Sequence, residues 1–217
     1  MACLSRAGIE ALTQPIIRQY KACFVPPRHL CYHVEPEKLE QLLGLAVQTR
    51  SLSPDGSILG LTSSGEIGLC LPDGNGGEEL VFLDGRTILI EQDLTCRARD
   101  RGRLHFTLAH EIGHQLVYRL EGGQPRISSF RRERPKIRDW AEWQADALAA
   151  SLLMPRDALE EAMFFYGLGE KIPVLSRKYA QNRYESFCLM ADFLQVSRQA
   201  LAYRMEQLGL VQRIADL

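Results

Sequence analysis

The sequence of 217 residues predicts an α+β fold in which a group of strands stands between two blocks of helices. The prediction depends on two observations. Short apolar runs separated by turn residues fill the stretch from Leu45 to Gln92, whereas apolar residues at helical spacing dominate on both sides of it. Strands and helices therefore come in blocks, without the alternation that is typical of βαβ units.

Local patterns predict each element. A helix over Gly8–Tyr20 is limited or bent by Pro15, and a helix over Glu37–Leu43 follows Pro36 and stops at Gly44. Four strands are expected in a small antiparallel meander: Ile58–Leu61, Ile67–Leu71, Leu80–Leu83 and Thr87–Ile90. Later helices are expected at about Leu104–Leu120, at about Trp140–Leu153 before Pro155, and over the last 40 or so residues.

Composition narrows the class of protein. With 46% hydrophobic and 24% charged residues the chain is an ordinary globular protein, and its net charge of −1 argues against a surface that grips nucleic acid all over. No uncharged stretch reaches the length of a membrane span and no signal peptide is apparent, so we expect a cytoplasmic protein with no membrane partner. The six cysteines form no Cys-x-x-Cys pair and are expected as reduced thiols.

The segment from Phe106 to His114 carries the clearest chemical signal. His110 and His114 are four residues apart, so on a helix both imidazoles lie on one face and can reach a single metal ion. Glu111 points to the side, where it can reach a metal-bound water without being a ligand. A surface helix with two solvated histidines is the alternative, but the apolar neighbours favour a buried helix. Gly113 costs about 1 kcal/mol against alanine in a helix, which predicts that another segment or the metal site approaches closely there.

A second helix can supply the third ligand that a catalytic zinc needs. Glu142 and Asp146 lie one turn apart in an alanine-rich stretch, where carboxylates are costly unless paired or bound to a metal. We interpret Glu142 as the third ligand and Asp146 as an acceptor for the outer N–H of one ligating histidine. The alternative is that either carboxylate pairs with a nearby arginine.

Two motifs together, Phe-Thr-Leu-Ala-His-Glu-Ile-Gly-His at 106–114 and Glu-Trp-Gln-Ala-Asp-Ala-Leu-Ala-Ala-Ser-Leu-Leu-Met-Pro at 142–155, resemble the ImmA/IrrE family of zinc metallo-endopeptidases. The resemblance implies zinc, with manganese as the second choice, on His110, His114 and Glu142, and Glu111 as the catalytic base. It implies a small zincin-like metallopeptidase domain, with an antiparallel sheet, an HExxH helix and a ligand helix, at residues 1–175. A helix-turn-helix-like segment would follow at 176–217. The turn-rich stretch Pro72–Glu79 and the basic connection before Trp140 depart from the family pattern.

Other histidines and one tyrosine lie near the motifs. His105 and Tyr118 are candidates for stabilising the oxyanion of a tetrahedral intermediate, although a core role suits each at least as well. His29 and His33 precede the strands and are expected at the surface or behind the ligands, not as ligands.

The stretch Arg119–Arg138 joins the two motif helices and holds seven basic residues against two acidic ones. We expect it near the mouth of the cleft, as a mobile loop that recognises an acidic substrate or lies close to DNA. A merely solvated loop is an equal alternative.

The last part of the chain, Phe187–Gly209, predicts two short helices with a break at Gln195–Ser197 and Ser197 as an N-cap. A helix-turn-helix could direct four residues toward a DNA major groove: Arg198, Gln199, Tyr203 and Arg204. Alternatively, the unit only packs on the core.

The leading functional hypothesis is a zinc endopeptidase that makes limited cuts in a regulatory protein. The resemblance implies a helix-turn-helix repressor of a mobile element or stress response as that partner, and direct DNA binding is less favoured. The alternatives are a DNA-binding regulator or a toxin–antitoxin component with a non-catalytic metal site. A structural zinc normally has four ligands, commonly cysteines, and no cysteine sits at ligand spacing here. Glu111 would also have no purpose in such a site.

Overall fold

The computed structural model describes residues 4–29, 31–97, 100–122, 124–133, 139–172 and 177–211, with side chains in the last range from residue 183 onward. The elements before the site are α1 (Arg6–Phe24), α2 (Pro36–Leu43), β1 (Ala46–Arg50), β2 (Ile58–Ser63), β3 (Glu66–Pro72), β4 (Glu78–Asp84), β5 (Thr87–Glu91) and the short 3-10 helix η1 (Gln92–Leu94). They are followed by α3 (Arg101–Glu121), β6 (Ile127–Arg131), α4 (Trp140–Leu153), α5 (Arg156–Phe165), α6 (Arg177–Phe193) and α7 (Arg198–Gln207). The expected α+β class is confirmed.

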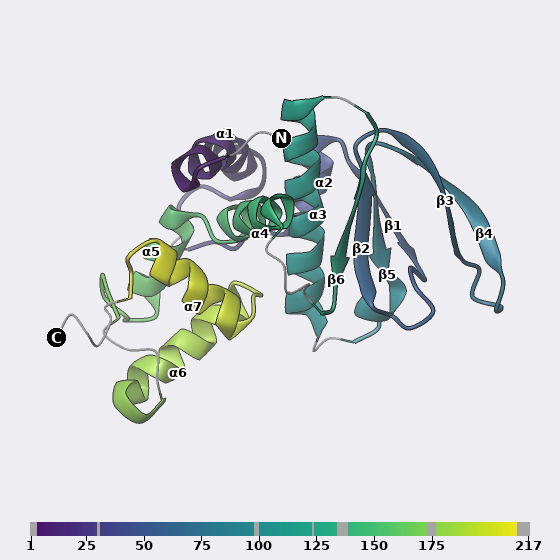
Figure 1. Ribbon diagram of the computed structural model, residues 1–217. Coiled ribbons are helices and arrows are strands. Elements are labelled where there is room, and N and C mark those ends of the chain that lie inside the picture. The colour runs from purple at the N-terminus through teal and green to yellow at the C-terminus, as the bar shows by residue number, and fades with distance from the viewer. Residues whose placement is uncertain are drawn as a thin grey trace.

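Helix α3 stands in the middle of the molecule, with the sheet on one side and α4 on the other (Figure 1). Every residue from Thr107 to Val117 is buried, including both motif histidines. Because both sides of the helix are covered, its apolar residues do not form a single stripe. Leu108 and Ile112 share a core with Ile88 and Ile90 of β5, which fixes the motif helix against the sheet.

The main sheet has four strands in the order β1-β5-β2-β6, and β1 runs parallel to β5. Strands β3 and β4 form a separate antiparallel hairpin that covers the outer face of this sheet (Figure 1). The predicted antiparallel meander is therefore wrong: the main sheet is mixed, and two of the expected strands leave it. Strand β5 is buried along its whole length because helices cover one of its faces and the hairpin covers the other.

Two strands of the main sheet were not predicted. Strand β1 is polar, with the sequence Ala-Val-Gln-Thr-Arg, and β6 reads Ile-Ser-Ser-Phe-Arg within the stretch expected as a loop. Both are edge strands, and neither has a fully buried residue, so no apolar alternation marks them. The turn-rich stretch Pro72–Glu79 connects β3 and β4 at the tip of the hairpin.

Helices α3 and α4 approach each other closely at Gly113, as the sequence predicts. A Cβ atom at position 113 would lie 2.9 Å from the carbonyl oxygen of Ala145 and 3.2 Å from Cβ of Leu148. Helix α4 begins with an N-cap from Asp139, whose side chain accepts a hydrogen bond from the backbone N–H of Ala141, and ends before Pro155. The small residues of α4 therefore permit the close packing that brings its carboxylates to the histidines.

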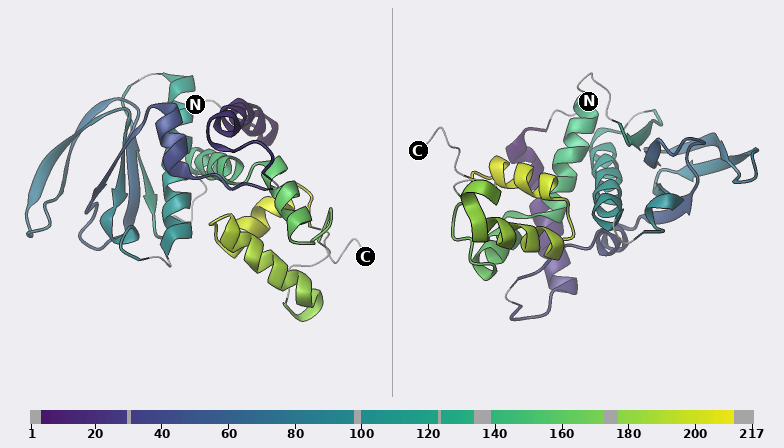
Figure 2. Two further views of the ribbon diagram at one scale, coloured as in Figure 1. Left: turned by 180° about the vertical axis from the view of Figure 1, so that it is seen from behind. Right: turned by 90° about the horizontal axis from the view of Figure 1, so that it is seen from below.

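Helices α5, α6 and α7 pack on the side of α4 that faces away from the sheet, as both views in Figure 2 show. Leu153 and Met154 share a core there with Met190, Leu194 and Leu201. The expected break before α7 is confirmed, since Oγ of Ser197 accepts a hydrogen bond from the backbone N–H of Ala200. The helix-turn-helix character of this pair and the domain division between residues 175 and 176 stay predictions.

Two simpler expectations concern thiols and membranes. The five cysteines that the structure describes are free: Cys23, Cys31, Cys70, Cys96 and Cys188. None of the helices in the described part of the chain has the length and apolar character that crossing a membrane requires.

Candidate metal centre

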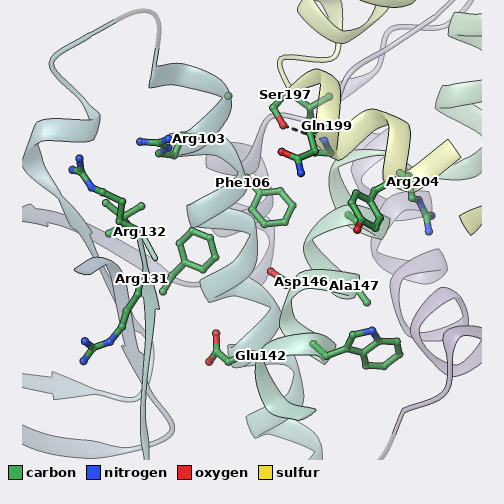
Figure 3. Close-up of a pocket in the computed structure, with 18 of the residues that line it drawn as sticks. Arg103, Phe106, Arg131, Arg132, Glu142, Asp146, Ala147, Ser197, Gln199 and Arg204 are labelled. Atoms are coloured by element: carbon green, nitrogen blue, oxygen red, sulfur yellow. Dashed lines mark hydrogen bonds between the residues drawn. The ribbon is translucent and has the colours of Figure 1, made fainter. Parts of the chain in front are cut away.

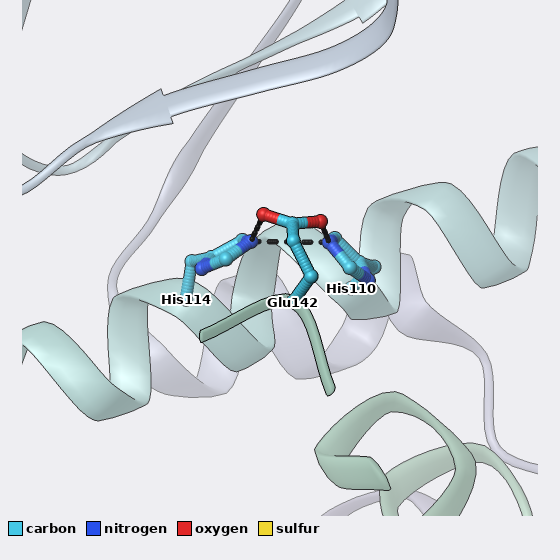
Figure 4. A group of neighbouring side chains, drawn as sticks. All are labelled: His110, His114 and Glu142. Atoms are coloured by element: carbon cyan, nitrogen blue, oxygen red, sulfur yellow. Dashed lines mark hydrogen bonds and ion pairs between the residues drawn. The ribbon is translucent and has the colours of Figure 1, made fainter. Parts of the chain in front are cut away.

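Three side chains from α3 and α4 converge on one point (Figure 4). The Nε2 atoms of His110 and His114 lie 3.0 Å apart, and each is 3.2 Å from a different carboxylate oxygen of Glu142. Both histidines are almost fully buried, whereas the side chain of Glu142 is 31% exposed. The centre is therefore enclosed from behind and open on the side of Glu142.

The spacing of these donor atoms fits a metal ion. Ligand atoms at about 2.0–2.1 Å from a tetrahedral zinc ion lie about 3.3 Å from one another. The separations of 3.0 and 3.2 Å are close to that value. Two imidazoles and a carboxylate also form the donor set of a catalytic zinc site, which leaves a fourth position for water. His110, His114 and Glu142 can therefore hold a metal ion.

Asp146 stands one turn beyond Glu142 and contacts His110 from behind. Its Oδ1 atom lies 3.1 Å from Nδ1 of His110, the ring nitrogen that faces away from the cluster. A carboxylate there accepts the N–H of Nδ1 and so leaves the lone pair of Nε2 directed at the centre. The structure thus brings Asp146 to the position that its predicted role requires.

Glu111 is fully buried beside the cluster and is held by the sheet. Its Oε1 atom accepts a hydrogen bond of 3.1 Å from the backbone N–H of Phe130 in β6. Its Oε2 atom is buried and has no hydrogen-bond partner among the described residues. The protein therefore fixes Oε1 of Glu111 and leaves Oε2 free to accept a hydrogen bond or a proton.

Gly60 of β2 makes room for Glu111. A Cβ atom at position 60 would lie 2.8 Å from Oε1 of Glu111 and 2.7 Å from Cγ2 of Thr107. The pairing of β2 with β6 shifts register between Ile58 and Gly60, next to this contact. Sequence reasoning missed both Gly60 and the partner in β6; the available signal was a glycine inside a predicted strand, which often marks a bulge or a close approach.

Burial and neighbouring charges shift the pKa values of these groups. Burial raises the pKa of Glu111 to about 8, although His110 opposes this effect. Burial would lower the pKa of His110, but hydrogen bonds to Asp146 and Glu142 outweigh it and raise that pKa to about 9. Hydrogen bonds from the two histidines hold the pKa of Glu142 below its usual range despite burial. The cluster thus favours a positive charge at its centre, and a metal ion supplies one.

The remaining histidines lie outside the centre. Nε2 of His105 faces Oε1 of Glu37 at 3.5 Å, and an oxyanion role for His105 stays a prediction. The ring of His33 packs edge-on against Phe193, and His29 is exposed. Neither joins the cluster, as expected.

Tyr118 remains beside the centre. Its ring stacks on His114 with a centroid separation of 5.9 Å, and its hydroxyl forms a hydrogen bond with Oγ of Ser128 in β6. Tyr118 also lines the groove that leads to the metal centre, a position compatible with an oxyanion donor. That role stays a prediction.

A groove with a volume of about 1830 Å³ leads to the metal centre (Figure 3). Its walls come from the first turns of α3, strand β6, helix α4, the end of α6 and helix α7. Glu142 and Asp146 line it directly. The basic stretch expected at the cleft mouth does lie here in part, but as strand β6 and not as a loop; Arg134, Lys136 and Arg138 lie outside the described residues.

The residues expected to face a DNA groove have different surroundings. Arg198, Gln199 and Tyr203 are exposed, and Gln199 and Tyr203 line the groove near the metal centre. Arg204 is wrong as a DNA contact because it is only 3% exposed and is bonded within the protein. Its guanidinium group donates to the carboxylate of Glu10 at 2.6 and 3.1 Å and to the carbonyl oxygen of Met154 at 2.9 Å.

A buried pair of imidazoles, a facing carboxylate and a second carboxylate beside them place the protein in the class of metallopeptidase-like proteins. Comparison with known families agrees. Residues 94–206, just over half of the chain, match the family model Peptidase_M78, described as the IrrE N-terminal-like domain. The chain belongs to this family, as its two motifs predict. No curated protein matches the sequence.

Proposed function

We propose that the protein is a zinc-dependent endopeptidase that makes limited cuts in one regulatory protein, a helix-turn-helix repressor. The observation that supports the enzyme assignment best is the arrangement of Glu111. A buried carboxylate with one oxygen fixed by the backbone of β6 and the other without a partner, next to a metal-ligand cluster, suits a base and has no purpose in a structural metal site.

His110, His114 and Glu142 would hold the metal, and zinc is preferred because imidazole and carboxylate donors at this spacing suit it. Manganese is the second choice. When bound, the metal would polarise a water molecule and the carbonyl group of the substrate peptide. Side chains of this protein would carry out the proton transfer, position the ligands and stabilise the oxyanion.

Glu111 would move the proton. Its Oε2 atom accepts a proton from the attacking water, while the hydrogen bond from Phe130 holds Oε1 in place. After the attack, burial favours the protonated form of this carboxyl group, which can then pass the proton to the leaving amine. Both halves of peptide hydrolysis can therefore use this one residue.

Two further residues would support the reaction. Asp146 holds the tautomer of His110 through the contact at Nδ1. Tyr118 can direct its hydroxyl toward an oxyanion if the bond to Ser128 exchanges on substrate binding. We assign Asp146 a positioning role and keep Tyr118 as the candidate donor.

The repressor as substrate is supported by the family to which the chain belongs and by the groove. The groove has a volume of about 1830 Å³ and is lined by residues of several helices and strands, which suits an extended segment of another protein better than a small molecule. The alternative, a DNA-binding regulator with a non-catalytic metal, is less well supported because Arg204 is buried and α7 borders the groove.

The enzyme assignment is tested by metal content and turnover together. Purified protein should carry one zinc per chain, and Glu142→Ala should lose it. Glu111→Gln should keep the metal and the fold but lower turnover by about 10²–10⁴-fold, because it removes only the base. Exposed Glu160 offers a matched control, since Glu160→Gln should change neither quantity. Full metal content in Glu142→Ala would reject the ligand assignment.

The substrate assignment needs a separate experiment. The protein is incubated with a helix-turn-helix repressor from the same organism and with casein, and the products are identified by mass spectrometry. We expect one or a few cuts in the repressor and little digestion of casein. Efficient casein digestion without preference for the repressor would reject a limited, substrate-specific role.

A further inference from the structure

The exposed arginines that line the groove gather mainly on one wall, where half-buried Asp100 lies beside them. Four exposed arginines stand where α3 begins and β6 ends, and Figure 3 labels three of them on the same side of the groove; this arginine wall consists of Arg101, Arg103, Arg131 and Arg132. The wall formed by α6 and α7 carries exposed Asp192 and Glu206. A ligand in the groove therefore meets opposite charges on its two sides.

The guanidinium groups of the arginine wall are available to a ligand. No ion pair joins any of them to another residue in the part of the chain that the structure describes. Three other arginines line the groove: Arg126 pairs with Glu121, Arg204 pairs with Glu10, and Arg6 of α1 is exposed. Unpaired arginines grouped at the edge of a groove suit planar, bidentate recognition of carboxylates.

The position of Arg101 and Arg103 is unfavourable for the helix itself. Both lie in the first turn of α3, a helix of 21 residues with no acidic residue in that turn. The N-terminal end of a helix dipole is positive, so cations there are destabilising. Asp100 at the N-cap supplies a negative charge beside them. A charge pattern that still breaks a local rule is expected at a functional site.

We propose that the arginine wall binds acidic side chains of an extended substrate segment, so that cleavage occurs in segments that are acidic on one side of the cut. This inference rests on the proposed peptidase function and names its substrate class. Phe106 and Phe130 add a second element of selection. They line the groove, and the ring centroid of Phe130 is 4.5 Å from that of His110, so a large apolar residue of the substrate fits beside the cleaved bond.

Nucleic acid is the other polyanion that such arginines could bind. A phosphate backbone in this groove would also meet Glu142 and Asp146 at the centre and Asp192 and Glu206 on the facing wall. Those carboxylates repel a ligand that is negative along its whole length. A peptide with acidic residues on one side avoids that repulsion, so we argue for the peptide.

Binding tests the proposal independently of cleavage. The full-length, zinc-loaded protein carries Glu111→Gln, and fluorescence anisotropy reports the binding of short labelled peptides. All share a central phenylalanine, flanked on one side by glutamates, glutamines or lysines. We expect the glutamate peptide to bind about tenfold more tightly than the glutamine peptide at low salt, with a smaller advantage as salt rises.

Double variants test whether the arginine wall causes the preference for the glutamate peptide. Arg131→Gln with Arg132→Gln should abolish most of the preference for the glutamate peptide. The matched control is Arg18→Gln with Arg86→Gln, which removes two exposed arginines that do not line the groove and should retain the preference. Arg131→Glu with Arg132→Glu should transfer the preference to the lysine peptide. Circular dichroism checks that each variant is folded.

Equal affinity for the glutamate and glutamine peptides, or an equal loss in the control variant, would overturn the proposal. Displacement by a short DNA oligonucleotide at lower concentration than the glutamate peptide would also overturn it, in favour of a nucleic-acid site. Cleavage is scored separately with the wild-type enzyme and a peptide mixture, where cuts should cluster beside acidic segments. If no peptide is cut, the peptidase function is in question, while the binding result still decides the role of the arginine wall.

Discussion

Gly113 of α3 and Ala145 of α4 are in direct contact, and a Cβ atom at position 113 would lie 2.9 Å from the carbonyl oxygen of Ala145. The metal centre lies around this contact. His110 and His114 flank Gly113 on one helix, and Glu142 and Asp146 flank Ala145 on the other. The separation of the two helices at this point therefore sets the distance between the histidines and the carboxylates.

Gly113→Ala should destabilise the protein and weaken metal binding. Alanine gains up to about 1 kcal/mol in helix propensity, but overpacking against the backbone of Ala145 costs about 1–3 kcal/mol. Chemical denaturation and zinc titration measure the two effects. The control is Gly8→Ala in α1, where a Cβ would meet Oγ of Ser5 at an ordinary 3.6 Å and stability should not fall. If both variants behave alike, the helix contact does not govern the centre.

Asp146→Asn should lower zinc affinity by about 10–100-fold while leaving the fold intact, because it weakens the hydrogen bond that orients His110. Competition with a chelator of known affinity measures the change. Asp192→Asn is the matched control, since Asp192 is an exposed carboxylate of the same groove outside the ligand cluster. Unchanged zinc affinity in Asp146→Asn would reject the positioning role.

Arg204→Met should reduce the free energy of unfolding by about 2 kcal/mol. Breaking a buried ion pair costs about 3–5 kcal/mol, but Glu10 is 41% exposed and can be hydrated once Arg204 is gone, so a smaller loss is expected. Arg198→Met, on the exposed side of α7, should stay within about 0.5 kcal/mol of the parent. Urea denaturation compares them, and equal stabilities would show that the link between α7 and α1 contributes nothing.

Asp157 should make stability depend on pH in the acid range. Burial alone would raise its pKa, but hydrogen bonds from Lys21 and Tyr32 outweigh burial and lower the pKa below its ordinary value of 3.8. A lowered pKa in the folded state stabilises the protein above the unfolded pKa, and this contribution is lost as pH falls through the folded pKa.

Asp157→Asn should therefore cost up to about 1 kcal/mol at pH 7, discounted because the side chain is half exposed, and almost nothing at pH 2. Thermal denaturation of both proteins across this range measures the difference. A constant difference at all pH values would contradict an ionic origin.

The helices that carry the centre were predictable because their signals are local. The spacing of His110 and His114, the alanines around Asp146 and the stop at Pro155 are all read within a few residues. Even the contact at Gly113 could be anticipated, since a glycine inside a helix is costly without a reason.

The sheet was less predictable because its order depends on residues far apart in the chain. Strand β6 is polar, and its pairing partner β2 lies more than 60 residues earlier. An edge strand with one covered face and few apolar residues carries no periodic signal. For the same reason the hydrogen bond from Phe130 to Glu111 could not be foreseen, and neither could the ion pair of buried Arg204 with Glu10.

By itself, the sequence determined which chemical groups can form the centre. The period of a helix places two imidazoles on one face whatever surrounds them, and an acidic pair in an apolar helix needs a counter-charge. Tertiary structure alone decided that Glu142 meets the histidines, that β6 holds one oxygen of Glu111, and that the unpaired arginines border the groove. Those relationships join segments that are distant in sequence, and only the packing of α3 between the sheet and α4 brings them together.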